Sequence, residues 1–345
     1  PKISAITSTS TSKAMRCLTL IQEEAKAMTD NLADLLVIYE HPSWQEPLFE
    51  ALEQRGVNYT TFDLKQGVFG ERDLPPAKLA FNQASPSAYL RGNTRAVPLG
   101  LAYIEALEAS GVTVLNGSRA FRFELSKSTQ ARVMALQGID YPRTLAFNDL
   151  SALESRAGEL GFPAILKPNQ GGSGARMFKV ESFQEVATII SQDDSLWEPD
   201  HVMLLQEYLE HDSEKDGIVR MEFLGGELLY AMKVKSAGST FNLCPSEVCN
   251  PVDGEPGACA IPETAPPTFE PFPEVPAEAV EIGARICELG GLDVAGIEYL
   301  ETPDGRRVFY DINANSNLRR PIGEAFGFDP FERVVDFLVS RIERS

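Results

Sequence analysis

Two kinds of apolar pattern alternate over residues 35–117, and this alternation constrains the fold most. Strand-like runs lie at residues 35–40, 59–64, 78–83 and 112–117, and helix-like segments at 45–56 and 97–111. Each helical segment ends in a glycine, the residue that most readily terminates a helix. Strands that alternate with helices predict a parallel sheet. We therefore expect a small α/β domain over residues 34–122, preceded by an extension at residues 1–33 without a clear role.

The second half of the chain has a different pattern, in which strand-like runs come in adjacent pairs. Residues 217–235 form two runs joined by Gly225-Gly226, a pair of residues typical of β-hairpin turns. Residues 295–313 form two more, joined across Pro303-Asp304-Gly305. Residues 251–277 are rich in proline without a clear period, which favours a long surface connection. We expect α+β structure here, with one subdomain over 123–208 and another over 209–345.

The net charge of the chain limits the kinds of molecule that it is expected to bind. Lys and Arg total 31 and Asp and Glu total 50, a formal net charge of −19. Such an excess repels phosphodiester backbones and anionic lipids, which argues against nucleic-acid and membrane binding. No membrane span or secretory signal is evident, and five scattered cysteines do not suggest a disulfide framework. We expect a cytoplasmic protein that acts on small molecules, and a homo-oligomer is not excluded.

A glycine-rich stretch follows the strand-like run that ends at Lys167. A Walker A loop has its lysine after the glycines and opens a helix, whereas here the lysine comes first and a strand-like run follows. A Rossmann fingerprint fails because Met177 occupies the position of the third glycine. The N–H groups of Gly172, Ser173 and Gly174 could form an anion-binding nest, or the loop could be a plain hairpin turn. The loop alone does not decide between these.

Three oxygen-bearing side chains occur on the last strand pair. Asp311 and Asn313 are two residues apart and therefore share a face, and Glu298 lies on the partner strand. Two carboxylates and an amide suit Mg²⁺, which binds carboxylate oxygens together with substrate phosphates. The alternative interpretation of the Asp-x-Asn pattern is a capped turn.

Three lysines on separate elements point to a polyanionic ligand. Lys127 lies at a helix start, while Lys167 and Lys233 occur in the apolar contexts AILKP and YAMKV. A charge in such a context is costly without an anionic partner. A nucleoside triphosphate would be such a partner.

An ordered set of motifs resembles the ATP-grasp enzymes. The set reads S-K-S, Q-G-I-D-Y-P, F-P-A-I-L-K-P, G-G-S-G, L-L-Q-E-Y-L, R-M-E, A-M-K-V, A-G-I-E and Y-D-I-N. It is most similar to the glutathione synthetase-like branch, which includes ribosomal-protein glutamate ligases and other amino-acid ligases. The resemblance covers about residues 34 to 340 of the printed sequence. It implies a pre-ATP-grasp α/β domain followed by two ATP-grasp subdomains that clasp the nucleotide.

The resemblance also implies a set of site residues. The residues that it assigns to ATP are Lys127, Lys167, Gly172, Ser173, Gly174, Gln206, Glu207, Tyr208, Leu209, Glu214 and Lys233. Among these, Gln206 to Leu209 would form the adenine hinge and Glu214 would contact the ribose. Glu298, Asp311 and Asn313 would hold one or two Mg²⁺ ions, which Mn²⁺ could replace. Relatives often have Asp and Glu where this chain has Glu298 and Asp311, a swap that keeps the charge and changes the reach.

The implied reaction is ATP-dependent amide bond formation through an acyl phosphate, with release of ADP and phosphate. Arg220 and Asn242 are candidates for orienting the acyl phosphate, and Arg319 with Arg320 for holding a substrate carboxylate. The alternative for the arginine pair is a surface ion-pair site. The whole chain has two alternative interpretations. It could be another kind of ATP-grasp enzyme, such as a kinase or a carboxylase, or it could be a non-catalytic ATP-binding module. The motifs do not identify the amino acid or small peptide on which the enzyme would act.

Overall fold

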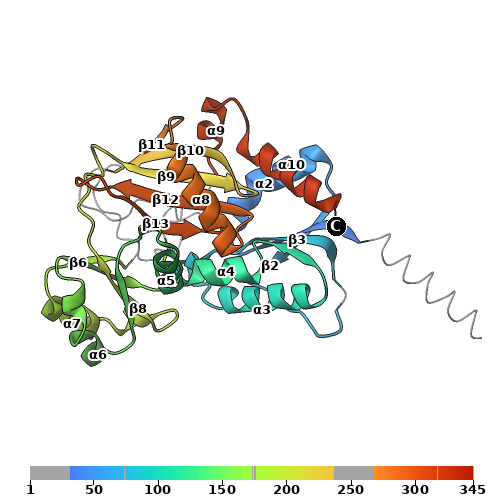
Figure 1. Cartoon of the computed structure of the whole chain (residues 1–345). Coiled ribbons are helices and arrows are strands. Elements are labelled where there is room, and N and C mark those ends of the chain that lie inside the picture. The colour runs from blue at the N-terminus through green and yellow to red at the C-terminus, as the bar shows by residue number, and fades with distance from the viewer. Residues whose placement is uncertain are drawn as a thin grey trace, which may run out of the picture.

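The computed structural model describes residues 32–73, 75–172, 174, 176–236, 267–316 and 318–344. Its first part is a parallel sheet in the order β2-β1-β3-β4. The strands are β1 (Ala33–Tyr39), β2 (Tyr59–Asp63), β3 (Ala77–Gln83) and β4 (Thr113–Leu115). The crossovers contain α2 (Pro42–Arg55), the 3₁₀ helix η1 (Pro86–Arg91) and α3 (Ala96–Ala109). The expected parallel α/β domain is confirmed, with α2 and α3 flanking the sheet (Figure 1).

The second part is a four-stranded antiparallel sheet in the order β5-β8-β6-β7. Its strands are β5 (Thr144–Phe147), β6 (Ala164–Pro168), β7 (Phe178–Val180) and β8 (Met203–Glu207). The short helices are α6 (Leu150–Glu154), η2 (Ala157–Glu159), α7 (Phe183–Gln192) and η3 (Asp194–Trp197). These elements share one hydrophobic core, and β6, which carries Lys167, lies between β8 and β7.

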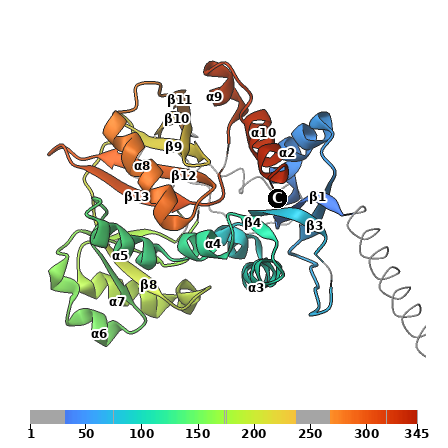
Figure 2. The ribbon, with the colours of Figure 1, turned by 45° about the vertical axis from the view of Figure 1, so that its right-hand side comes forward.

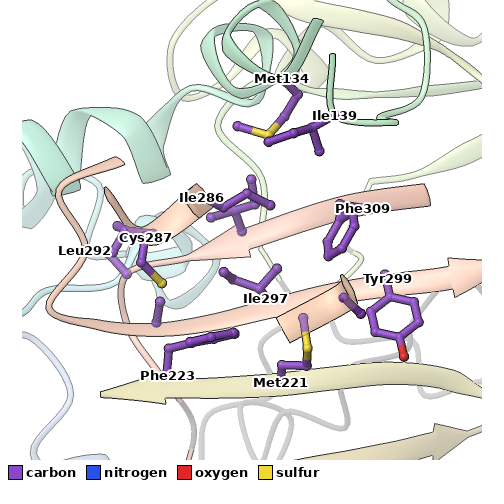
Figure 3. Close-up of a cluster of buried hydrophobic side chains, with 14 of the residues drawn as sticks. Met134, Ile139, Met221, Phe223, Ile286, Cys287, Leu292, Ile297, Tyr299 and Phe309 are labelled. Atoms are coloured by element: carbon purple, nitrogen blue, oxygen red, sulfur yellow. The ribbon is translucent and has the colours of Figure 1, made fainter. Parts of the chain in front are cut away.

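The third part is a five-stranded sheet in the order β11-β10-β9-β12-β13. Its strands are β9 (Ile218–Leu224), β10 (Glu227–Lys235), β11 (Thr268–Pro271), β12 (Val294–Glu301) and β13 (Arg307–Asn313). Both expected hairpins are confirmed, and Gly225, Gly226 and Gly305 have the positive φ angles that their turns require. Helix α8 (Ala277–Gly290) covers one face of this sheet and buries Ile286 against Ile297 and Phe309 (Figure 3).

Three elements differ from the expectation. Residues 268–271 form β11, which pairs with the edge of β10, so the expected surface connection over 251–277 includes a mostly exposed strand that was not foreseen. Helix α5 (Lys127–Gln137) begins where expected, because the Ser126 side chain caps the N–H of Thr129, but α4 (Ser118–Leu125) directly precedes it. Helix α9 (Arg320–Ala325) was also not foreseen. The extension at residues 1–33, apart from residues 32 and 33, lies outside the described residues.

The last helix, α10 (Pro330–Ile342), returns to the first sheet rather than staying with the third. Its buried residues Val334 and Leu338 pack with Leu48 and Leu52 of α2 in one hydrophobic cluster. Figures 1 and 2 both show α10 beside α2. The C-terminal helix therefore joins the first and third sheets. No helix in the described part of the chain has the length and apolarity needed to span a bilayer.

Candidate active site

A cavity of about 280 Å³ lies where the three sheets meet. The first sheet contributes Phe81 and Gln83, the second contributes Lys167, and the third contributes Glu298 and Asp311. Most of the expected nucleotide and metal residues line it. They are Lys127, Lys167, Gly172, Gly174, Gln206, Glu207, Tyr208, Leu209, Arg220, Glu298, Asp311 and Asn313.

The third sheet places three charged side chains in one row across three strands. Glu298 of β12 stands in register with Arg220 of β9 on one side and with Asp311 of β13 on the other. The Arg220 Nη1 donates to Glu298 Oε1 at 2.9 Å, and the Tyr310 hydroxyl donates to Glu298 Oε2 at 2.8 Å. Strand register brings Arg220, Glu298 and Asp311 together, because residues opposite each other in a sheet share a face.

A second row, two residues further along the strands, supports the first. Glu222 and Asn313 lie in register with Gly296 between them. The fully buried Glu222 accepts from Arg220 Nε at 2.6 Å and also binds the Ser316 hydroxyl. A Cβ at Gly296 would lie 2.8 Å from the Arg220 Cζ, so only glycine leaves room for the guanidinium. Sequence reasoning missed Glu222 and Gly296. The alternation of side chains in R-M-E does place Glu222 on the same face as Arg220.

The two expected phosphate lysines have different electrostatic surroundings. The Lys127 ammonium pairs with the Asp311 carboxylate and lies 3.4 Å from the carbonyl oxygen of Ile312. Within the described ranges the Lys167 ammonium forms no hydrogen bond or ion pair, and the charge of Asp311 acts on it only from a distance. Burial, and next the charge of Lys127, lower the pKa of Lys167 to about 8. Lys167 is thus a buried cation without a bonded counter-charge.

A buried carboxylate that sequence reasoning missed lies beside these lysines. Glu124 of α4 lines the cavity, and its Oε1 accepts from the backbone N–H of Asn315 at 3.0 Å. Burial raises the pKa of Glu124 to about 7, against the lowering effects of that hydrogen bond and of Lys127. Its position within the apolar run F-E-L was the signal available in the sequence, because acidic residues rarely occupy buried positions.

The carboxylates of the expected metal set influence each other. Burial and the neighbouring charge of Asp311 raise the pKa of Glu298. Burial would also raise the pKa of Asp311, but its ion pair with Lys127 outweighs burial and lowers it. The Asn313 amide donates to Asp311 Oδ2 at 2.8 Å, which orients that carboxylate.

The donor set fits Mg²⁺ better than a transition metal. Within the described residues no three His, Cys, Asp or Glu side chains form a metal-binding group. The expected set holds only two carboxylates and an amide, which suits an ion that takes one or two carboxylates and completes its shell with phosphates and water. A cation here would also relieve the repulsion between Glu298 and Asp311.

The glycine loop packs against the first domain. Gly171, Gly172 and Gly174 line the cavity, while Ser173 is not among the described residues. A Cβ at Gly172 would lie 3.2 Å from the Cα of Ser87 and would overlap the Ser87 Cβ. This close approach requires glycine, and it holds the loop next to η1.

The expected adenine hinge connects β8 to the third sheet. Gln206 Nε2 donates to Thr144 Oγ1 at 2.8 Å. The Glu207 carboxylate binds Arg306 Nη1 at 3.2 Å. In the described structure the backbone N–H of Leu209 has no hydrogen-bond partner, and Ile165 and Leu300 add apolar surface to this end of the cavity.

Several expected site residues do not line the cavity. Glu214 is exposed. Lys233 stands in register with Val219, on the face covered by α8, and its Nζ lies 5.0 Å from the ring centroid of Phe272. The Arg319 guanidinium lies over Phe269 with its Cζ 3.5 Å from the centroid. Nothing in this geometry supports their expected roles.

Asn242, another expected site residue, lies outside the described residues. Arg320 donates to Asp329 at 2.6 Å, and its side chain is 39% accessible, which agrees with the surface ion-pair alternative.

No protein-family model matches the chain. Among curated proteins, it is 24% identical over 303 residues to a probable alpha-L-glutamate ligase of Rhodopirellula baltica, covering 86% of this chain and 68% of the relative. It is 23% identical over 238 residues to beta-citrylglutamate synthase B of Danio rerio, covering 68% of this chain. The match spans 52% of that synthase, about half its length.

Solved structures of ATP-grasp ligases superpose on most of the chain. One is the ATP-grasp ligase PsnB complexed with a phosphomimetic variant of its minimal precursor, Mg and ADP (TM-score 0.62, 20% identity, 90% of this chain and 99% of PsnB). Another is D-alanine–D-alanine ligase from Bacillus anthracis (TM-score 0.63, 14% identity, 91% and 98%). The chain therefore has the ATP-grasp fold, and the expected likeness to ATP-grasp ligases is confirmed.

Proposed function

We propose that the protein is an ATP-dependent ligase that joins a carboxylate to an amine through an acyl phosphate and releases ADP and phosphate. One observation carries the proposal: the cations Lys127, Lys167 and Arg220 converge from separate elements on one buried cavity. Transfer of a phosphoryl group needs preorganised positive charge more than a protein nucleophile. The curated relatives named as glutamate ligases favour a ligase over a kinase, a carboxylase or a binding module.

The nucleotide would lie between the second and third sheets. Its adenine would occupy the end lined by Ile165 and Leu300, where the unpaired N–H of Leu209 supplies a donor. Its phosphates would extend toward Lys127 and Lys167. An anionic ligand would supply the counter-charge that Lys167 lacks and thereby offset the cost of burying its ammonium.

Glu298, Asp311 and Asn313 would hold Mg²⁺, as one ion or two, with Mn²⁺ as a substitute. When bound, the ion would neutralise phosphate charge and orient the nucleotide. Asp311 would offer an ionised carboxylate, since Lys127 lowers its pKa, and the charge of the ion would favour the ionised form of Glu298, whose pKa is raised by burial and by Asp311.

Arg220 would stabilise the negative charge of the substrate carboxylate at the other end of the metal row. Its guanidinium is held by Glu222 and Glu298, so little side-chain freedom is lost when a substrate binds. Preorganised groups of this kind stabilise developing charge without reorganisation. Asn242, Arg319, Glu214 and Lys233 stay predictions without geometric support. We place the enzyme in the cytoplasm, acting on small molecules and not on nucleic acid.

The test is a screen of amino-acid and dipeptide pairs with ATP and Mg²⁺. ADP, AMP, phosphate and pyrophosphate are followed, and the amide product is detected by mass spectrometry. We expect ADP and phosphate in equal amounts with an amide product. Formation of AMP would overturn the acyl-phosphate route, and phosphate retained on the product would indicate a kinase.

A matched pair of variants tests the metal residues. Asp311→Asn should lower Mg²⁺-dependent turnover by about 100-fold or more, because the amide neither neutralises Lys127 nor offers an anionic oxygen. The exposed Asp194→Asn makes the same chemical change away from the cavity and should leave turnover within about twofold. Circular dichroism of both variants checks that the fold is kept. Near-normal turnover of Asp311→Asn would reject the metal assignment.

A further inference from the structure

Part of the cavity lining is apolar and comes from α2, β3, β12 and α10. We call this part the apolar chamber and define it by Trp44, Leu48, Phe81, Val294, Phe331 and Val334, all of which line the cavity. Five of the six pack in one hydrophobic cluster at the carboxyl end of the first sheet. The chamber is therefore a rigid part of the fold, formed by the return of α10 onto α2.

No cationic side chain lines the apolar chamber within the described ranges. The cations of the cavity are Lys127 and Lys167, the expected phosphate lysines, and Arg220, which is paired with Glu222 and Glu298. Residues 237–266, which lie outside the described part of the chain, contain no lysine or arginine. A carboxylate placed in the chamber would thus lose its hydration without gaining a counter-charge, which is strongly unfavourable.

Arg91 is the cation next to the chamber, and it is already engaged. Its guanidinium lies over the ring of Trp44, with the Cζ 4.6 Å from the centroid. Its Nε and Nη2 donate to the two carboxylate oxygens of the buried Glu40, and its Nη1 donates to Ser87 at 3.1 Å. This bidentate pairing neutralises the charge of Arg91, and the residue does not line the cavity.

Gln45 is a polar residue of the apolar chamber whose amide would gain a hydrogen-bond partner from a bound molecule. Its side chain is 97% buried, since only 3% is exposed, and it lines the cavity next to Trp44 and Leu48. In the described structure its amide has no hydrogen-bond partner. Buried amides are nearly always paired, because an unpaired one costs free energy. A bound molecule with a neutral polar group would pair it.

We propose that one of the two joined substrates is an amino acid with an uncharged, apolar side chain that occupies the apolar chamber. Gln45 hydrogen-bonds to the polar atoms beside that side chain. This rests on the ligase function proposed above and departs from the glutamate in the relatives' names, because the chamber has no counter-charge for a side-chain carboxylate. It assigns the first sheet and α10 to substrate selection.

The test compares side chains of similar size and different charge. ADP release is measured with Mg²⁺ and ATP for pairs that contain leucine, methionine or phenylalanine, and for pairs in which glutamate, aspartate or lysine takes that place. We expect kcat/KM to favour an apolar member by about 100-fold or more over glutamate, because the chamber leaves a carboxylate unpaired. In parallel, thermal stabilisation by each amino acid is measured in the presence of a non-hydrolysable ATP analogue and Mg²⁺.

Two arginine variants test the charge argument directly. Gln45→Arg introduces a cation into the chamber and should shift the ratio of kcat/KM by about tenfold or more toward glutamate. Glu46→Arg introduces the same side chain at the next, exposed position of α2 and should leave the ratio unchanged. Gln45→Leu removes the amide without adding charge and should keep the preference for apolar substrates while raising KM.

The outcomes separate this inference from the proposed function. Turnover with acidic but not with apolar members would overturn the inference and leave the ligase standing. Failure of ATP and its analogue to bind would overturn both. Nucleotide binding without stabilisation by any apolar amino acid would overturn the inference alone, even if no pair turned over.

Discussion

Replacing Gly296 with alanine should disrupt the charged row of the active site through one methyl group. The added Cβ would lie 2.8 Å from the Cζ of Arg220 and 3.1 Å from Glu222 Oε2, and closer still to the Arg220 Nη2. Cβ atoms do not approach other heavy atoms below 3.0 Å, so the guanidinium must move. It would then lose its short contacts with Glu222 and Glu298.

The expected cost follows from the burial of these groups. Overpacking a well-packed site costs about 1–3 kcal/mol. Breaking a buried ion pair, which leaves a charge uncompensated, costs about 3–5 kcal/mol. Because Arg220 can keep part of its pairing by shifting, we expect Gly296→Ala to lose about 3 kcal/mol of unfolding free energy, within the range of these two effects. We also expect kcat/KM to fall by about tenfold or more, since a preorganised charge is displaced.

The assay is urea-induced unfolding followed by circular dichroism, together with ADP release. Gly158→Ala is the control, because a Cβ there meets nothing within 4 Å, and it should change the unfolding free energy by less than about 0.5 kcal/mol. Arg220→Met removes the group with which the methyl collides, so adding Gly296→Ala to it should cost little more. Additive costs in the double variant, or a Gly296→Ala protein as stable and active as the parent, would refute the reasoning.

Three further predictions follow from the same cavity. Burial and the charge of Lys127 lower the pKa of Lys167 to about 8. Bound phosphates would favour the protonated ammonium, so the affinity for Mg²⁺·ADP should fall as the pH rises through 8. Calorimetry in buffers of different ionisation enthalpy should show proton uptake that Lys167→Met abolishes, and release of protons would contradict this. Lys233→Met should keep nucleotide affinity within about twofold, because Lys233 lies over Phe272 outside the cavity; a tenfold loss would restore its expected role. Gly172→Ala should raise the KM for ATP by about tenfold, since the methyl would overlap Ser87 and push the glycine loop away, and an unchanged KM would show that the loop need not touch η1.

Local patterns predicted most of the elements, because strand and helix spacing is a property of short segments. The two hairpins were predictable because Gly225-Gly226 and Gly305 supply the positive φ that their turns need. Helix α5 was placed correctly by its cap at Ser126. The short helices α4 and α9 and the edge strand β11 were not, since their stability comes from contacts with distant segments rather than from their own spacing.

The candidate site was predictable where a residue type is unusual in its context. A lysine in an apolar strand and an Asp-x-Asn pair stand out, and Lys167, Asp311 and Asn313 all line the cavity. Glu222 and Glu124 were missed, because the chain has 50 acidic residues and the weak local signals in R-M-E and F-E-L do not show that these two are buried. Gly296 is one of 26 glycines, and its importance depends on a guanidinium from another strand.

By itself, the sequence determined the parallel first domain, the two hairpins and the placement of Asp311 and Asn313 on one face of a strand, since each follows from spacing along a few residues. The tertiary structure decided which charges meet. Lys127 reaches Asp311 across 184 positions of the chain, and α10 packs against α2. It also decided that Lys233 lies away from the cavity, because strand register selects the face on which a side chain lies. Register and packing join segments far apart in the chain, so no local pattern contains them.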